Sequence, residues 1–291
     1  MTNLRKSKII NTTLTVLSKA LLIIFAFLIL LPFWIILVNS VKTPAEIASA
    51  TFTWWPTQGF DFTSYSAAFD LSLAKYTATI ISGFKNTLLF TLPPVLIGVL
   101  ASSLSAYAFS KINFKGKDIL FTMVLLTMSI PVTIAFIPQY FLYGAIGWLD
   151  TPLPLLIPGM FGSAGVVFFL LQYMRGIPSE LCEAAKVDGL GNIGVFFRII
   201  LPISMPALIA QFILTFIAGY NDYMKPLLFL SGSPQLYPMQ LVLRNLSPGT
   251  NDTLIQSAMA SGVIALIPLV LLYGIFNNFI VNNIAVSSMK G

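Results

Sequence analysis

The chain has 291 residues, of which 57% are apolar and 9% are charged, whereas ordinary soluble domains carry roughly 25% charged residues. Its formal net charge of +6 does not indicate nucleic-acid binding, because the basic residues lie between long uncharged stretches and do not cluster on one face. Histidine is absent and Cys182 is the only cysteine, which excludes an intrachain disulfide and the common zinc and Cys/His catalytic sites. Composition therefore predicts an integral membrane protein with one transmembrane domain.

The uncharged stretches are long enough to cross a membrane as helices, which takes about 20 residues each. Six such stretches occupy residues 20–41, 86–110, 119–149, 151–174, 199–221 and 253–289. Those that begin at residues 119 and 253 exceed one span, so each is expected to continue into an interfacial or protein-buried segment. The stretch 226–243 is also uncharged, but its Ser, Gly and Pro residues predict a loop outside the membrane.

The first stretch raises the alternative of a cleaved signal peptide, because Arg5, Lys6 and Lys8 precede it. The apolar run is longer than the usual 7 to 15 residues, and the candidate cleavage site at residues 48–50 lies well beyond it, so the segment is expected to remain as the first span. With the N-terminus in the cytoplasm, most Lys and Arg residues of the connecting segments fall on the inner side. This bias predicts an N-in, C-in topology.

A distinct pattern lies between the fourth and fifth predicted spans. Ser179 can cap a short helix, Glu180 suits the positive end of that helix, and Gly189 allows a left-handed exit. The pattern predicts a helix, a turn and a second short helix on the cytoplasmic face. The glycines at 189–194 also match G-x-G-x-x-G, but no strand precedes them, so no dinucleotide cofactor is expected.

This segment resembles the cytoplasmic signature of the permease subunits of binding-protein-dependent ABC importers, which reads E-A-A, three residues, G, nine residues, I-x-L-P. The matching residues are Glu183, Ala184, Ala185, Gly189, Ile199, Leu201 and Pro202. The wider resemblance covers nearly the whole chain and is to carbohydrate importers, specifically the six-span subunit of the maltose-type pair. Residues 147–151 resemble that family's G-L-x-D-T, and residues 220–223 resemble its W-N-D-F.

The resemblance implies an all-α membrane protein with the six transmembrane helices of the type I ABC importer permease fold, located in the cytoplasmic membrane of a bacterium. Residues 1–18 are expected to form a cytoplasmic tail, 19–283 the transmembrane permease domain and 284–291 a second cytoplasmic tail. Within the domain, residues 175–203 are expected to form a coupling loop and residues 225–258 an external loop. The part of the external loop from residue 231 to 252 either reaches into a solute-binding protein or is a passive connection.

The resemblance also implies a mechanism in which the coupling loop docks into a groove on an ATPase. Glu183 would offer a hydrogen-bond acceptor, the small Ala184 and Ala185 would permit close approach, and Gly189 would set the turn. Asp188, Ile199, Leu201 and Pro202 complete the predicted ATPase-coupling site, and the competing interpretation is an ordinary interhelical loop. The expected partners are a second permease subunit, two ATPase subunits that hold ATP and Mg, an extracytoplasmic solute-binding protein, membrane lipid and the sugar substrate.

Polar residues within the membrane usually face a cavity or a partner, which identifies candidates for the substrate pathway. They are Tyr220, Asn221, Asp222 and Tyr223 in the fifth span, together with Gln139 and Tyr140. Interfacial aromatics beside a solvated Asp are the alternative interpretation. The chain has no P-loop sequence and no convincing nucleophile and base pair, so it is expected to be a transport subunit and not an enzyme. The alternatives to a sugar permease are an ABC permease for another solute and an ion-coupled secondary transporter.

Overall fold

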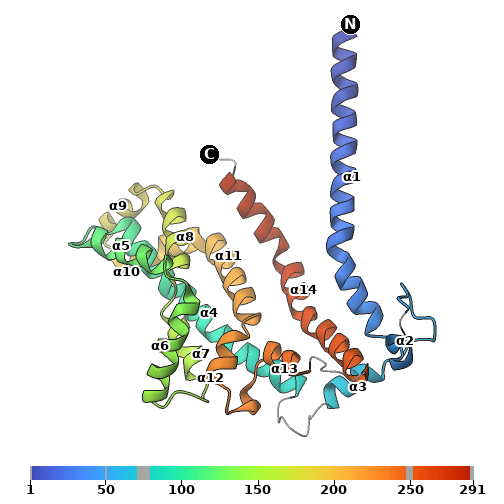
Figure 1. The fold of residues 1–291 in the computed structure, drawn as a ribbon. Helices are drawn as coiled ribbons and strands as arrows, with labels where there is room; N and C mark the ends of the chain where they lie inside the picture. Colours follow the sequence, from blue (N-terminus) through green and yellow to red (C-terminus); the bar gives the residue numbers. More distant parts are fainter. Residues whose placement is uncertain (1, 50, 71–78, 247–251, 289–291) are drawn as a thin grey trace. The chain divides into compact units, whose positions relative to one another are not determined.

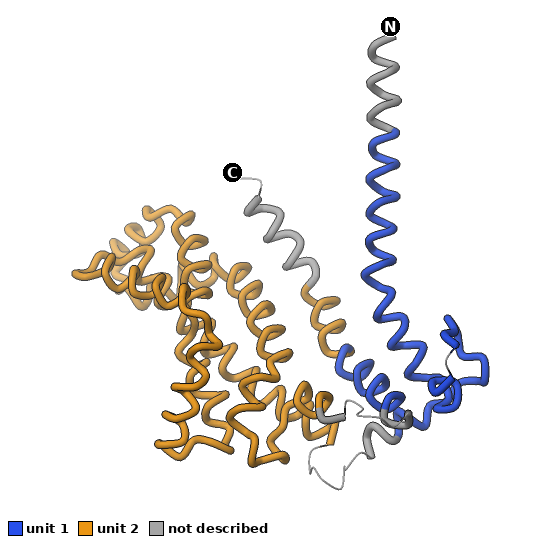
Figure 2. The backbone as a smooth tube through the Cα atoms, in the orientation of Figure 1, with its two compact units in different colours: residues 1–70, 246–266 blue, residues 71–245, 267–291 orange. Residues whose placement is uncertain are grey.

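The computed structural model describes residues 2–49, 51–70, 79–246 and 252–288, and all regular structure in these residues is helical. The chain divides into two compact units (Figure 2). Unit 1 comprises residues 1–70 and 246–266, and unit 2 comprises residues 71–245 and 267–291. Helix α14 (Asp252–Ser288) contributes its first part to unit 1 and its remainder to unit 2.

Unit 1 is dominated by α1 (Thr2–Asn39), whose described side chains are almost all apolar and exposed. Two short helices follow it, α2 (Pro44–Ala48) and α3 (Thr63–Asp70). The first turn of α2 is capped by Thr43, whose side chain accepts a hydrogen bond from the amide of Glu46. An exposed apolar helix of this length fits a membrane span in contact with lipid.

Unit 2 is built around α4 (Ile80–Lys111), which packs against α7 (Leu153–Met160), α8 (Ala164–Arg175) and α11 (Leu201–Tyr220). Small residues allow the backbones to approach closely, as is typical of helix packing in membranes. A Cβ atom on Gly98 of α4 would lie only 2.3 Å from the carbonyl oxygen of Gly159 on α7. The close approach therefore requires glycine at this position.

The remaining helices of unit 2 lie at the two ends of this packed group (Figure 1). At one end lie α5 (Lys117–Met128), α9 (Glu180–Val187) and α10 (Asn192–Val195). At the other end, α12 (Met224–Phe229) packs against α7 and α6 (Val132–Ala145). The end that holds α9 also holds most of the basic residues of unit 2, among them Lys111, Lys115, Lys117, Arg175, Lys186 and Arg198.

Each of the six predicted spans corresponds to helical structure that is long and apolar enough to cross a membrane. Five are single spans, at residues 13–39, 80–111, 153–175, 192–220 and 255–276 of the part that the structure describes. The third predicted span is instead a pair of helices, α5 and α6, that meet at an angle of 96°. The excess length of this run is therefore taken up by a sharp bend at residues 129–131, where Pro131 precedes α6.

The stretch predicted as an external loop is partly helical. Its residues include α12, a short 3-10 helix at Pro234–Leu236 and α13 (Met239–Leu246), with Met239 and Leu241 fully buried. Two polar residues of α4 hold it down: the Asn86 side chain donates to the carbonyls of Gln235 and Tyr237, and the amide of Met239 donates to the Thr87 hydroxyl at 2.8 Å. Residues 247–251 lie outside the described part of the chain.

Candidate functional site

Helix α9 carries the centre of the motif and has two different faces. Cys182 and Ala185, three residues apart, are buried in the core of unit 2 together with Met174 of α8. Glu183 and Ala184 are exposed on the opposite side. The two alanines predicted to contact an ATPase therefore differ, because Ala185 packs against the chain itself and only Ala184 faces outward.

The exit from α9 shows why glycine stands at position 189. Gly189 has φ = +87° and its amide donates to the Lys186 carbonyl at 3.0 Å, while the amide of Leu190 donates to the Ala185 carbonyl at 3.0 Å. This pair of hydrogen bonds is the Schellman motif, which favours glycine at the left-handed position. No atom lies within 4 Å of a Cβ built on Gly189, so the requirement is conformational and not steric. The predicted left-handed exit is confirmed.

The start of α9 differs from the prediction. Ser179 makes no capping hydrogen bond through its side chain, because its backbone is already helical, with φ = −71° and ψ = −24°. A serine caps a helix from an extended conformation, in which the hydroxyl reaches the following amides. The backbone carbonyl of Ser179 instead accepts from the amides of Cys182 and Glu183, at 2.9 and 3.1 Å.

After the turn, the chain forms one continuous helix from Asn192 to Tyr220. The second short helix predicted after the turn is therefore the start of this long helix, and Pro202 does not interrupt it. A π-helical turn at Phe196–Ile200 precedes this proline, and the amide of Leu201 donates to the Phe196 carbonyl five residues earlier. A wider turn of this kind accommodates a proline that has no amide hydrogen.

The remaining residues of the motif divide between packing and surface. Ile199 and Leu201 are half-buried against the core of unit 2, and Pro202 is exposed. Two apolar side chains that the motif does not include are much more exposed: 87% for Val187 and 74% for Ile193. They flank the turn at residues 188–191. The exposed residues Glu183, Ala184, Val187, Asp188 and Ile193 are called the α9 surface below.

The α9 segment is fixed to the rest of unit 2 by basic residues. The Lys111 ammonium at the end of α4 donates to the Ile177 carbonyl just before α9. The Arg175 guanidinium lies 5.8 Å from the centre of the Phe121 ring of α5, a cation–π contact. These contacts connect the segment that carries the α9 surface to α4, α5 and α8.

A cavity of about 360 Å³ lies within unit 2, between α4, α7, α11 and α12. Its walls are largely apolar, with Phe90 and Leu155 among them. Side-chain hydroxyl groups from three parts of the chain also line it, namely those of Thr87, Thr91, Ser102, Ser163 and Thr215. The charged residues in its lining are Asp222 and Lys225. The combination of apolar walls with a few polar groups is typical of a site for a small molecule.

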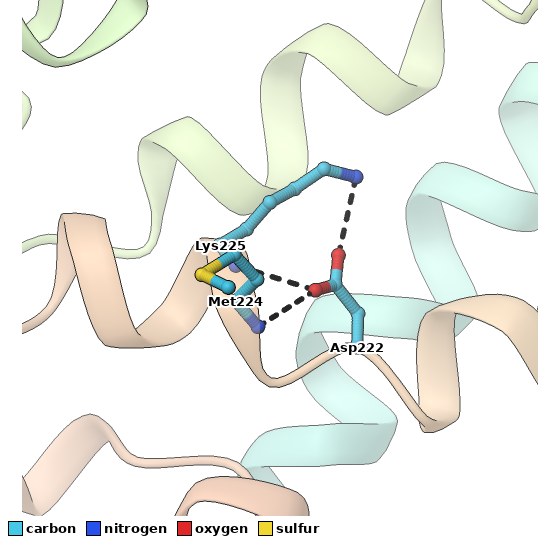
Figure 3. Close-up of polar contacts among 3 residues, drawn as sticks. All are labelled: Asp222, Met224 and Lys225. Atoms are coloured by element: carbon cyan, nitrogen blue, oxygen red, sulfur yellow. Dashed lines mark hydrogen bonds and ion pairs between the residues drawn. The ribbon is translucent and has the colours of Figure 1, made fainter. Parts of the chain in front are cut away.

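Asp222 and Lys225 form an ion pair in the cavity lining, with 3.2 Å between the Lys225 ammonium and Oδ2 of Asp222 (Figure 3). The other carboxylate oxygen, Oδ1, accepts hydrogen bonds from the amides of Met224 and Lys225, at 3.1 and 3.2 Å (Figure 3). The Asp222 carboxylate therefore satisfies two amides at the start of α12 and at the same time neutralises the lysine. The lining carries one charge of each sign.

The other candidates in the fifth span lie outside the cavity lining. Tyr220 is 1% exposed and belongs to the core of unit 2. Asn221 connects two helices, because its amide nitrogen donates to the Ile217 carbonyl and its oxygen accepts from the Gln240 side chain. Tyr223 is exposed and lies under the Arg244 guanidinium, 5.7 Å from the ring centre. Of the four residues, Asp222 alone reaches the cavity among the described side chains.

Gln139 and Tyr140 lie on α6, away from the cavity lining. Sequence reasoning missed the hydroxyls of α4 and the lysine at 225. A signal for the first was present: Thr87, Thr91, Gly98 and Ser102 recur at intervals of three, four or their sums, which places them on one face of a helix. Lys225 was assigned to an external loop, and only the turn at Asp222 brings it back to the cavity.

Comparison with known proteins agrees with this arrangement. Residues 95–286 match the family described as Binding-protein-dependent transport system inner membrane component. A probable ABC transporter permease protein of Pyrococcus horikoshii is 34% identical over 72% of this chain and 74% of that protein. The arabinooligosaccharides transport system permease protein AraQ of Halalkalibacterium halodurans is 30% identical over the same shares of the two chains. A bacterial ABC transporter involved in import of the acidic polysaccharide alginate is similar in structure, with a TM-score of 0.79, 21% identity, and coverage of 91% of this chain and 95% of its own.

The apolar helices, the exposed α9 segment and the internal cavity together define a membrane transport subunit. The chain belongs to the family of binding-protein-dependent transport system inner membrane components, the permeases of ABC transporters. The all-helical fold predicted from the sequence is confirmed, as is the location in a membrane.

Proposed function

We propose that this permease forms, with a second permease subunit, the pathway by which a sugar or oligosaccharide enters a bacterial cell. A solute-binding protein outside the membrane delivers the sugar, and two ATPase subunits drive the import with ATP and Mg. The observation that carries the proposal is the hydroxyl-lined cavity between α4, α7, α11 and α12. The name of the arabinooligosaccharide permease, a relative at 30% identity, supports the choice of carbohydrate.

The chemistry of the cavity suits a neutral sugar. Sugars offer hydroxyl groups along their edges and apolar C–H faces, and the lining offers threonine and serine hydroxyls beside the Phe90 ring. Because Asp222 and Lys225 neutralise each other, the lining has no unbalanced charge to attract an ionic solute. The volume of about 360 Å³ lies at the lower end of the range for small-molecule sites. The cavity is therefore sized for a small solute or for a short part of an oligosaccharide.

The α9 surface is the proposed contact with the ATPase. Val187 and Ile193 expose apolar side chains that association would remove from water, and Glu183 offers an acceptor to donors across the interface. Ala184 keeps the centre of this surface flat. Cys182 and Ala185 anchor α9 from below, so their role is to position the surface. An N-in topology places this end in the cytoplasm, which agrees with the basic residues that gather there.

The test is solute-dependent ATP hydrolysis by the assembled transporter. The tagged chain is isolated from its own host with the subunits that accompany it, reconstituted in lipid, and supplied with binding protein and neutral or acidic oligosaccharides. Neutral oligosaccharides are expected to stimulate hydrolysis and to be imported. Thr91→Val keeps the side-chain shape but removes the hydroxyl, and it is expected to weaken import. Glu183→Gln is expected to lower both ATP hydrolysis and import.

Two results would contradict the proposal. Stimulation by amino acids or osmolytes but by no sugar would assign the chain to an ABC permease for another solute. Uptake by the chain alone, without ATP and with an ion gradient, would assign it to a secondary transporter. The two variants test the two sites separately. If Glu183→Gln assembles normally and leaves hydrolysis and import unchanged, the α9 surface has no part in coupling. If Thr91→Val leaves import unchanged, the Thr91 hydroxyl has no part in sugar binding.

A further inference from the structure

The segment that follows α1 in unit 1 presents an aromatic surface. Five large aromatic side chains in it are more than half exposed, and Trp54 and Trp55 are 56% and 55% exposed. The five residues, called the aromatic face below, are Phe52, Trp54, Trp55, Phe60 and Phe62. Exposed apolar patches of this kind mark contact with another molecule or with a membrane.

The aromatic face is continuous with the exposed side of α1. The Trp55 ring stacks on Trp34 of α1, with 6.0 Å between ring centres. Phe60 contacts Trp55 edge-on at 5.7 Å, and Phe62 stacks on Phe60 at 6.4 Å. Trp34 lies within the span at residues 13–39, so the row of rings begins in the membrane span and extends past its end.

Lys42 and Glu46 of the same segment are buried, whereas Asp61 is half-buried and accepts from the Thr63 amide and hydroxyl at 2.8 and 2.5 Å. The Lys42 side chain is buried, where its ammonium donates to the Thr53 carbonyl at 2.7 Å and lies 5.3 Å from the centre of the Phe52 ring. No Lys, Arg, Asp or Glu occurs between residues 47 and 60. In a loop surrounded by water, the reverse arrangement is expected, with charges outside and aromatic rings inside.

Glu46 is also buried, and it organises the loop from within. Its carboxylate accepts from the Thr53 hydroxyl at 2.7 Å, from the amide and hydroxyl of Thr57 at 3.0 and 3.1 Å, and from the amide of Gln58 at 3.3 Å. Burial raises the pKa of Glu46, but these hydrogen bonds outweigh it, and the pKa lies below its ordinary value. The carboxylate thus stays charged and satisfied without water.

We infer that the aromatic face rests in the interfacial layer of the phospholipid bilayer, on the side of the membrane where α1 ends. Tryptophan is enriched in this layer, where its ring meets acyl chains and its N–H meets headgroups and water. The loop is not helical between residues 51 and 62, so its backbone groups need headgroup or water partners and the face stays out of the hydrocarbon centre. The face anchors the outer end of the first span at a fixed depth.

The experiment measures quenching of tryptophan fluorescence by brominated phosphatidylcholine. The chain has four tryptophans, and Trp34→Phe with Trp148→Phe leaves Trp54 and Trp55 as its own reporters; the emission of the other subunits is subtracted with a matched assembly in which Trp54 and Trp55 are also replaced by Phe. Further Trp54→Phe and Trp55→Phe versions report on each residue alone. Bilayers carry bromine either close to the headgroup or near the acyl-chain ends, and acrylamide serves as the quencher in water.

The expected result is strong loss of emission with bromine close to the headgroup, weaker loss with bromine near the chain ends, and little quenching by acrylamide. Adding the solute-binding protein should leave these values unchanged. Strong acrylamide quenching without lipid quenching would overturn the inference, and acrylamide protection that appears only with binding protein would assign the face to that protein. Emission that neither quencher reaches would mean that another subunit covers the face. None of these outcomes depends on the transported solute.

Discussion

The carboxylate of Asp150 accepts a hydrogen bond of 2.6 Å from the amide of Gly232, a residue 82 positions further along the chain. The backbone of Asp150 adds two bonds to the same region: its amide donates to the Phe229 carbonyl at 2.8 Å, and its carbonyl accepts from the Ser233 hydroxyl at 3.1 Å. The turn before α7 is therefore fastened to the segment that joins α12 to α13. That segment in turn packs on α4 beside the cavity.

Gly232→Ala is expected to break this fastening. A Cβ atom at 232 would lie 2.6 Å from one carboxylate oxygen of Asp150 and 3.0 Å from the other, so the short hydrogen bond is lost. The expected loss of stability is about 1 kcal/mol, measured as a lower thermal unfolding midpoint of the purified complex. Gly165→Ala is the matched control, because no atom lies within 4 Å of its Cβ position. Equal midpoints for the two variants would contradict the prediction.

Gly189→Ala is expected to weaken coupling by moving the α9 surface. Both Gly189 and Gly191 have free space for a Cβ atom, but Gly189 has φ = +87° and Gly191 has φ = −72°. Only the first substitution forces an L-residue into the left-handed region, at a cost of roughly 1–2 kcal/mol. ATP hydrolysis and import in lipid vesicles are the measurements. Loss of coupling in Gly191→Ala as well would indicate that steric bulk and not backbone conformation matters there.

Asp222→Asn is expected to change solute preference more than stability. The amide oxygen of Asn can still accept from the amides of Met224 and Lys225, so α12 keeps its start. The half-exposed ion pair itself contributes no more than about 1 kcal/mol to folding. Removing the carboxylate leaves Lys225 unbalanced, so import of an acidic oligosaccharide should rise relative to a neutral one of the same length. Lys225→Gln should shift the ratio in the opposite direction.

The loop that carries the aromatic face is expected to open in acid. The pKa of Glu46 lies below its ordinary value in the folded loop, so its hydrogen bonds stabilise the loop above the unfolded pKa and are lost as the pH falls through the lowered folded value. Opening should therefore occur only below the ordinary pKa of a glutamate side chain, seen as a change in Trp54 and Trp55 emission. Glu46→Gln should remove this pH dependence. A transition that persists in that variant would assign it to another group.

Much of the fold was predictable because long uncharged stretches of sequence indicate membrane spans. Each predicted stretch corresponds to a single span or, at α5 and α6, to a bent pair, and the span at residues 153–175 contains both α7 and α8, since the hydrocarbon length sets the same requirement everywhere. The bend itself was not predictable, because a proline at 131 is compatible with a kink as well as a break. The loop predicted at residues 226–243 is partly helical, because Asn86 and Thr87 of α4 satisfy backbone groups that turn-forming sequence alone leaves open.

The site was predictable in part for a related reason. The left-handed turn at Gly189 follows from local chemistry, whereas the division between Ala184 and Ala185 depends on the core beneath α9. Among the pathway candidates, sequence alone ranked Asp222 with its neighbours. Tertiary contacts separated them, because Tyr220 turns into the core and Asp222 turns to the cavity.

The helix from Asn192 to Tyr220 joins the turn at Gly191 to the cavity at Asp222 without a break. At 1.5 Å per residue, its 29 residues extend about 43 Å. A displacement of Ile193 at one end of the helix therefore tilts or rotates the other end. The π-helical turn at residues 196–200 is the place where the helix can bend most easily. Tightening or loosening that turn would change how far a movement of one end displaces the other, while leaving both the proposed ATPase contact and the proposed sugar contact untouched.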